Sequence, residues 1–185
     1  MPLQPTLTTA RLVLRPFTRA DAPAVQRFIG DARVADTTLT IPHPYLDGMA
    51  EAWIEKIEPM HATGAGVVFA VTEPGAGLVG TLSLQLEPKH HRAELGYWIA
   101  VPHWGKGYAT EAVVAAIAFG FDTLGVNRIE AAFMPRNAAS GRVMDKAGMQ
   151  LEGRQRQYFC KNGIFEDVIR YAILREDHER ARGKA

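Results

Sequence analysis

Hydrophobic and polar residues alternate in several stretches of the chain, and a period of two is typical of β-strands with one buried face. The run Arg11–Phe17 reads R-L-V-L-R-P-F and predicts a first strand. Farther along, Val67–Val71 and Leu78–Leu86 flank the turn residues Gly75–Gly77, and His90–Ala100 follows after a short connection. Together these three runs predict an antiparallel meander.

Helical spacing of apolar residues alternates with these strands. Thr18 and Asp21 approximate a capping box ahead of a predicted helix at Ala22–Ile29. In contrast, Asp31–Pro44 contains three threonines and two prolines with little periodicity, so we expect a loop there. Further helices are predicted at about Asp47–His61, Ala109–Phe121 and Ala138–Ala147.

The last third of the chain returns to strands. Arg128–Met134 reads as one strand, and Met149–Phe159 pairs with Ile164–Leu174 around the Asn162-Gly163 turn signal. Strands before and after a β-turn-α-β unit predict an α/β (mixed α+β) fold, with one mixed sheet and helices on its faces. The charged tail Glu176–Ala185 is expected to fray.

Composition narrows the class of protein. The chain has 185 residues, of which 47% are hydrophobic, and this is enough for one compact domain over 1–185 with a core at about 7–176. Lys and Arg number 21 against 20 Asp and Glu, so nothing indicates a nucleic-acid surface. The single cysteine, Cys160, and the lack of a signal peptide or membrane span favour a soluble protein of the reducing cytoplasm.

The stretch Val101–Glu111, V-P-H-W-G-K-G-Y-A-T-E, is the most distinctive in the chain. A strand-like run leads through Gly105 and Gly107 into a helix start, where unpaired backbone N–H groups and the helix dipole favour a phosphate. Lys106 adds a positive charge. The spacing matches neither a P-loop nor the dinucleotide fingerprint, which would need glycine in place of Thr110.

This glycine loop resembles the acetyl-CoA pyrophosphate loop of the GNAT N-acetyltransferases, with Trp104 standing where that superfamily usually has Gln or Arg. The W-G-x-G-Y-A-T-E-A spelling, Asn137–Ser140 and Lys146–Met149 resemble the RimJ/RimL-type branch, which acetylates N-termini of ribosomal proteins. The resemblance covers roughly Leu7 to Glu176. It implies a twisted, mostly antiparallel sheet of about seven strands with a V-shaped splay that binds acetyl-CoA, without a metal, and it is compatible with a homodimer.

The resemblance also assigns the cofactor-binding residues. Pantetheine is expected along the strand before the loop, the pyrophosphate on the loop backbone, and the sulfur near the start of the next helix. The predicted residues are Trp98, Ile99, Ala100, Trp104, Gly105, Lys106, Gly107, Tyr108, Ala109, Thr110, Asn137 and Ser140.

Two residues are candidates for catalysis. Glu94 lies in the otherwise apolar run A-E-L-G-Y-W-I, where loss of solvation would raise its basicity, so it is the candidate base for the amine. The alternatives are an exposed or Arg-paired Glu94 with a water chain as the base. Ser140 is the candidate that stabilises or protonates the thiolate, although Asn137 and Ser140 also read as a simple helix cap. Tyr158 is the reserve proton donor.

Other conspicuous residues have plainer explanations. His90 and His91 lie in a charged turn without a third metal ligand, and Cys160 lacks a partner pattern for nucleophilic catalysis. His103 is a weaker candidate for a substrate contact. Glu111 is expected to favour the helix dipole and not to act as a base.

The sequence therefore predicts direct acetyl transfer from acetyl-CoA to a primary amine, with the N-terminal α-amine of a protein as the favoured acceptor. Loops Asp31–Pro44 and Tyr158–Phe165 are expected to flank the amine channel. Two alternatives stay open: an acetyltransferase for a small amine such as an antibiotic, polyamine or amino acid, and a CoA-binding sensor without turnover.

Overall fold

The structure is a computed structural model and describes residues 4–183. Its centre is one eight-stranded sheet in the order β1-β2-β3-β4-β5-β6-β8-β7. All neighbouring strands are antiparallel except β5 and β6, which run parallel. The strands are β1 (Leu7–Thr8), β2 (Val13–Pro16), β3 (Gly66–Glu73), β4 (Gly77–Glu87), β5 (Arg92–Ile99), β6 (Arg128–Phe133), β7 (Gln150–Lys161) and β8 (Ile164–Leu174).

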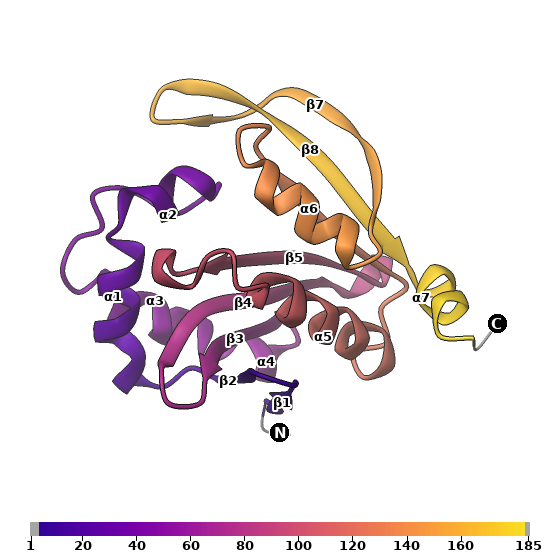
Figure 1. Cartoon of the computed structure of the whole chain (residues 1–185), viewed down its shortest axis with the longest axis horizontal. Coiled ribbons are helices and arrows are strands. Elements are labelled where there is room, and N and C mark those ends of the chain that lie inside the picture. The colour runs from indigo at the N-terminus through magenta and orange to yellow at the C-terminus, as the bar shows by residue number, and fades with distance from the viewer. Residues whose placement is uncertain (1–3, 184–185) are drawn as a thin grey trace.

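Helices lie on both faces of this sheet (Figure 1). One face carries α5 and α6, and the other carries the N-terminal helices, so the predicted mixed fold is confirmed. The helices are α1 (Ala22–Ile29), α2 (Ala32–Thr37), α3 (Met49–Ile57), α4 (Met60–Thr63), α5 (Tyr108–Asp122), α6 (Ala138–Lys146) and α7 (Arg175–Ala181), with single 3-10 turns at Arg19–Asp21, Pro88–His90 and Val101–His103. No helix in the described part of the chain is long and apolar enough to cross a membrane.

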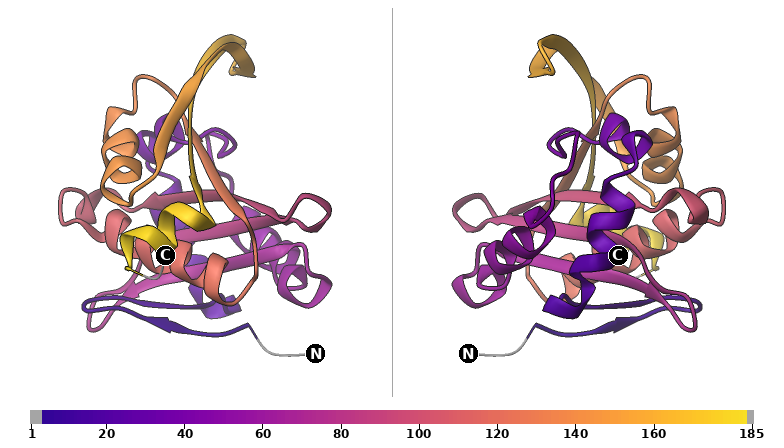
Figure 2. Two further views of the ribbon diagram at one scale, coloured as in Figure 1. Left: turned by 90° about the vertical axis from the view of Figure 1, so that its right-hand side faces the viewer. Right: turned by 90° about the vertical axis from the view of Figure 1, so that its left-hand side faces the viewer.

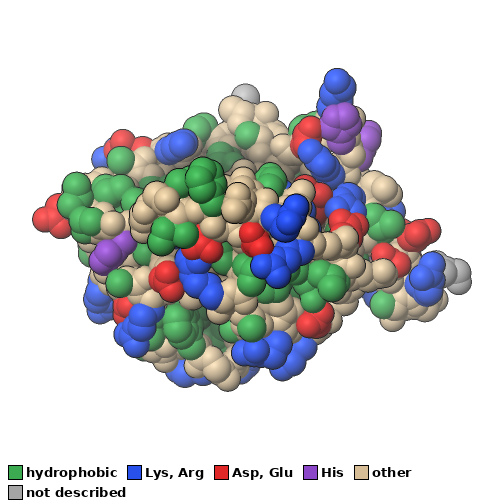
Figure 3. All heavy atoms as spheres, turned by 90° about the horizontal axis from the view of Figure 1, so that it is seen from above, with side chains coloured by type: hydrophobic (Ala, Val, Ile, Leu, Met, Phe, Trp, Pro, Cys, Tyr) green, Lys and Arg blue, Asp and Glu red, His purple; other side chains and the backbone are tan. Residues whose placement is uncertain are grey.

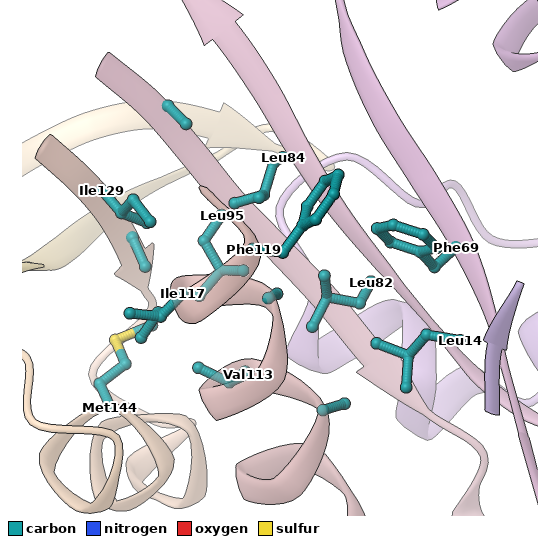
Figure 4. Packing of buried hydrophobic residues seen from close by; sticks show 14 of the residues in the cluster. Leu14, Phe69, Leu82, Leu84, Leu95, Val113, Ile117, Phe119, Ile129 and Met144 are labelled. Carbon is teal, nitrogen blue, oxygen red and sulfur yellow. The ribbon is translucent and has the colours of Figure 1, made fainter. Parts of the chain in front are cut away.

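The larger core lies between the sheet and α5. Phe69 and Phe119 meet edge to face at 5.8 Å. Leu82, near this pair, and Ile117, near Met144, are fully or almost fully buried (Figure 4). Gly120 lets α5 approach the sheet, because a Cβ there would lie 2.7 Å from Cδ1 of Ile129. This close packing holds the C-terminal part of α5 against β6.

Four sequence expectations needed correction. The sheet has eight strands and not about seven, since the two-residue β1 pairs with β2. The expected loop Asp31–Pro44 contains α2, which begins at the Asp31 cap, and the helix expected at Asp47–His61 is divided into α3 and α4. The charged tail forms α7 up to Ala181, where Arg175 donates hydrogen bonds to the carbonyls of Phe121 and Val126. Residues 184–185 lie outside the described residues.

The hairpin of β7 and β8 projects beyond the rest of the sheet (Figures 1 and 2). Its turn at Asn162 and Gly163 has positive φ angles of 51° and 80°, as the Asn-Gly signal predicts. Large apolar side chains are exposed at its tip, among them Tyr158, Ile164 and Phe165.

Candidate active site

Strands β5 and β6 pair at only three positions and then separate. The pairs are Arg92 with Arg128, Ala93 with Ile129, and Glu94 with Glu130. Beyond Glu94 the two parallel strands diverge, which leaves the edge of β5 without a β-partner on that side. This is the V-shaped splay that the sequence led us to expect.

Only alternate residues of β5 present backbone groups to the splay. The N–H of Ala100 donates to the carbonyl of Val79 on β4 at 2.8 Å, and the Ala100 carbonyl accepts from the N–H of His103. Because backbone groups alternate between the two sides of a strand, those of Trp98 also face β4, whereas those of Tyr97 and Ile99 face the splay. Of the three residues predicted to offer backbone groups to pantetheine, Ile99 is therefore correctly oriented, and Trp98 and Ala100 are not.

The glycine loop has the geometry of an anion site. Gly105 and Gly107 have φ angles of 75° and 81°, a left-handed conformation that favours glycine. Gly107 caps the 15-residue helix α5. The backbone N–H groups of its first three residues, Tyr108, Ala109 and Thr110, have no acceptor among residues 4–183. The helix N-terminus therefore presents donors and a partial positive charge that fit a pyrophosphate.

Trp104 ties the loop to the splayed strand. Its indole Nε1–H donates to the carbonyl of Ile99 at 2.6 Å, and the side chain is otherwise half-exposed. Trp104 stands where the family usually has Gln or Arg. Its hydrogen bond to Ile99 holds β5 and the glycine loop together. Its nitrogen is already bonded, so we expect it to act on the cofactor through the indole ring and not through that donor.

Thr9 and Arg11, in the connection between β1 and β2, brace the loop through Glu111 and Lys106. Glu111 accepts hydrogen bonds from the Thr9 hydroxyl at 2.6 Å and from the Arg11 backbone N–H at 2.8 Å, and Arg11 Nη1 donates to the carbonyl of Lys106 at 2.9 Å. Burial acts to raise the pKa of Glu111, but the bonds from Thr9 and Arg11 outweigh it and hold that pKa below its usual value. Glu111 is therefore a structural anion, as expected, and Arg11 adds a positive charge that the sequence did not reveal.

Ser140 and Asn137 meet at the start of α6. Oδ1 of Asn137 accepts the backbone N–H of Ser140 at 3.3 Å, so Asn137 does cap the helix. Its Nδ2 donates to the carbonyl of Thr37 at the end of α2. Asn137 therefore links two helices, and its proposed bond to the cofactor remains a prediction.

Tyr97 is the residue that sequence reasoning missed. Its hydroxyl lies 2.7 Å from Oγ of Ser140, and burial raises the pKa of Tyr97 to about 12 although the bond with Ser140 opposes this effect. Strand parity shared with Leu95 and Ile99 could have placed Tyr97 on the core face under α5 and α6, but it gave no sign of the contact with Ser140.

Glu94 lies where the strands part, but its carboxylate is exposed. The expected desolvation is absent, because the side chain faces away from the core of α5 and α6 and no helix covers it. The alternative of an exposed Glu94 matches the structure, whereas pairing with Arg92 or Arg128 does not occur, because Arg92 binds Glu87 and Arg128 binds Glu152. A base role for Glu94 would rest on its position and on access to the amine, and not on burial.

Three side chains fasten α2 to the far side of the splay. The carbonyls of residues 35 to 38 at the end of α2 accept hydrogen bonds from Lys161, Arg136 and Asn137. Lys161 contacts two of them, those of Ala35 and Thr38. We call this set the α2 clasp. It brings the two segments predicted to flank the amine channel into contact.

None of the remaining candidates is hydrogen-bonded to Ser140 in the described part of the chain. Tyr158 accepts a hydrogen bond from Arg170 at 2.9 Å on the sheet face away from α6, so it is poorly placed as a reserve proton donor to the thiolate. His103 contacts the rings of Phe28 and Tyr108, and its Nδ1 is buried without a hydrogen-bond partner in the described chain. Cys160 is exposed. Within the described residues there is no cluster of three potential metal ligands.

Comparisons with known proteins agree with this geometry. The family model described as an acetyltransferase (GNAT) domain matches residues 11–150. An uncharacterized N-acetyltransferase, YoaA of Bacillus subtilis, is 33% identical over 92% of this chain and 97% of its own length. The ribosomal protein uS5-alanine N-acetyltransferase of Escherichia coli is 29% identical over 92% of this chain and 91% of its own.

A relative with a different acceptor is also similar: the spermidine N(1)-acetyltransferase of Vibrio cholerae, at 24% identity over 91% of this chain and 96% of its own. Among solved structures, a GNAT acetyltransferase from Bacillus anthracis has a TM-score of 0.83 at 29% identity and covers 92% of this chain and 99% of that one. The family match, the separation of β5 from β6 and the glycine loop all support the same assignment. The chain belongs to the GNAT family and is an acetyl-CoA-dependent N-acetyltransferase.

Proposed function

We propose that this enzyme acetylates the N-terminal α-amine of a protein or peptide whose first residue is small. The observation that carries the proposal is that each carboxylate of the two segments expected to flank the amine channel, and of their borders, is paired with an arginine. A polyamine or an aminoglycoside carries several positive charges, and its recognition would need carboxylates that are free to pair with it.

The two flanking segments and their borders contain three carboxylates, and all three are paired with arginines. Asp31 pairs with Arg33 at 2.7 Å, and hydrogen bonds from Arg33 lower the pKa of Asp31 to about 2. Asp36 and Glu166 both pair with Arg136. Positive and negative side chains are interspersed across the face that includes these segments, with no acidic patch (Figure 3).

The other polar groups of these segments suit a peptide backbone. The hydroxyls of Thr37 and Thr38 donate to carbonyls within α2, so their oxygens keep acceptor capacity for a peptide N–H. Asn162 and Tyr158 add neutral donors and acceptors on the hairpin. The name of the E. coli relative, which describes acetylation of a protein alanine, agrees with such an acceptor.

The proposed chemistry divides between the two faces of the sheet. Acetyl-CoA supplies an activated thioester, with its pyrophosphate on the Trp104–Thr110 backbone and its amides along Tyr97 and Ile99. The amine approaches from the Glu94 face, loses a proton to Glu94 or to a water held there, and attacks the carbonyl carbon. As the N–C bond forms, the C–S bond breaks and its electron pair stays on sulfur, where the Ser140 hydroxyl stabilises the charge.

A panel of acceptors with thiol release as the readout tests this proposal. It should contain peptides that begin with Ala, Ser or Thr, the same peptides with a blocked N-terminus, and spermidine. We expect free peptides to have the highest kcat/KM and blocked peptides to be inert. A higher kcat/KM for spermidine than for every peptide would overturn the acceptor assignment while leaving the acetyltransferase assignment intact.

A further inference from the structure

Tyr97 and Ser140 make a hydrogen bond across the mouth of the splay. Tyr97 belongs to β5, one arm of the splay, and Ser140 to the helix that follows β6, the other arm. Their hydroxyl oxygens are 2.7 Å apart, and by geometry either can be the donor; the Tyr97 hydroxyl also donates to the Ser140 carbonyl at the longer distance of 3.3 Å. No other polar side chain in the described chain is hydrogen-bonded to either hydroxyl.

We infer that Tyr97 is a positioning residue for acetyl transfer: it donates its proton to Oγ of Ser140 and leaves the serine proton directed at the cofactor sulfur. The inference rests on the proposed role of Ser140 beside that sulfur. A serine hydroxyl by itself rotates freely and has two acceptor sites, so its proton has no fixed direction. A donor at 2.7 Å fills one acceptor site and restricts the rotation.

The protonation state of Tyr97 fits this role. Burial keeps the phenol neutral throughout the pH range of an assay, so it always has a proton to donate. A hydrogen bond received by Ser140 also polarises its O–H group and strengthens the bond that it gives. The tyrosine proton is not transferred: the leaving sulfur keeps the C–S electron pair, accepts a hydrogen bond from Ser140, and takes its proton from solvent after release.

The arrangement can be tested without an amine substrate, by measuring the acidity of the thiol of CoA bound to the enzyme. The ultraviolet absorbance of the thiolate is titrated against pH in the enzyme–CoA complex. The chain has one cysteine, which is exposed, so a Cys160→Ser background removes the thiol of the protein itself. Because no amine is present, failure of the proposed peptide acceptor would not affect the result.

We expect Ser140→Ala to make the bound thiol less acidic, and Tyr97→Phe to reduce its acidity by about three- to tenfold, as for loss of one hydrogen bond. The double variant should match Ser140→Ala alone, because Tyr97 acts through Ser140. Tyr171→Phe is the matched control, since Tyr171 is a buried tyrosine of the same core whose hydroxyl contacts Asp145.

In turnover, Tyr97→Phe should lower kcat by a similar factor with KM for acetyl-CoA unchanged. Additive effects of the two substitutions on thiol acidity would overturn the inference, as would an unaltered thiol titration in Tyr97→Phe. An equal change in the Tyr171→Phe control would also overturn it, because the effect would then come from general loosening of the core.

Discussion

Glu94 and Ser140 lie on opposite faces of the central sheet. Glu94 alternates with Ala93 and Leu95, which face the core under α5, whereas Ser140 contacts Tyr97 on that core side. The amine and the cofactor can therefore approach the splay from different sides. This geometry suits direct attack of the amine on the thioester and needs no covalent enzyme intermediate.

The first prediction concerns the glycine loop. Gly107→Asp should reduce acetyl-CoA affinity by at least tenfold, because a side chain at a φ of 81° strains the loop and its carboxylate repels the phosphates. Isothermal calorimetry with CoA measures the effect. Gly125→Asp is the control, since Gly125 has a φ of 71° and lies beyond the other end of α5. Unchanged affinity in Gly107→Asp would show that the pyrophosphate binds elsewhere.

The second prediction concerns Glu94. If it accepts the proton of the amine, Glu94→Gln should lower kcat by roughly 10²–10⁴, the range typical of acid–base groups, with little change in CoA binding. Because Glu94 is exposed, we expect a reduction in kcat near the lower end of this range. The pH–rate profile of the variant is the decisive measurement, and a profile identical to that of the wild type would assign proton removal to water.

The third prediction concerns Glu111 and stability. Its pKa is lowered in the folded state, so its contribution is present at neutral pH and is lost as pH falls below about 4.5 through the folded pKa. Glu111→Gln should cost about 1–3 kcal/mol at pH 7, as for hydrogen bonds to a charged group, and much less at pH 3. Urea unfolding at both pH values tests this. An equal loss at both would mean that charge is not the source of the stabilisation.

The fourth prediction concerns the α2 clasp. Lys161→Met keeps most of the apolar stem and removes the donor to Ala35 and Thr38. We expect faster hydrogen exchange in residues 32–38 and a several-fold rise in KM for the peptide acceptor, with CoA affinity preserved. Lys89→Met, in an exposed turn, is the control. Unaltered exchange in α2 would show that the other donors hold it without Lys161.

Local patterns predicted much of this structure. The alternation in Arg11–Phe17, the Asn162-Gly163 turn and the two glycines of the cofactor loop each depend on neighbours in sequence, and the structure has the conformation they indicate. The sheet and its parallel β5–β6 pair followed from the order of strands and helices together with the family resemblance.

Long-range and solvent effects were not visible in the sequence. Helix α2 has six residues, too few for a periodic pattern, and side chains about a hundred positions away hold its end. Glu94 was expected to be desolvated because its neighbours are apolar, but alternation puts them on the opposite face. Tyr97 looked like ordinary strand core, since only the tertiary fold brings its hydroxyl to Ser140.

The α2 clasp also bears on how the enzyme is assembled during synthesis. Lys161 follows its partner Ala35 by 126 positions. In contrast, Lys106 of the cofactor loop follows its partner Arg11 by 95 positions. Because a chain emerges from the ribosome N-terminus first, the glycine loop can meet Arg11 while Lys161 is still to be added. The Lys161 contacts of the α2 clasp can therefore form only after the residues that brace the phosphate loop have all been synthesised.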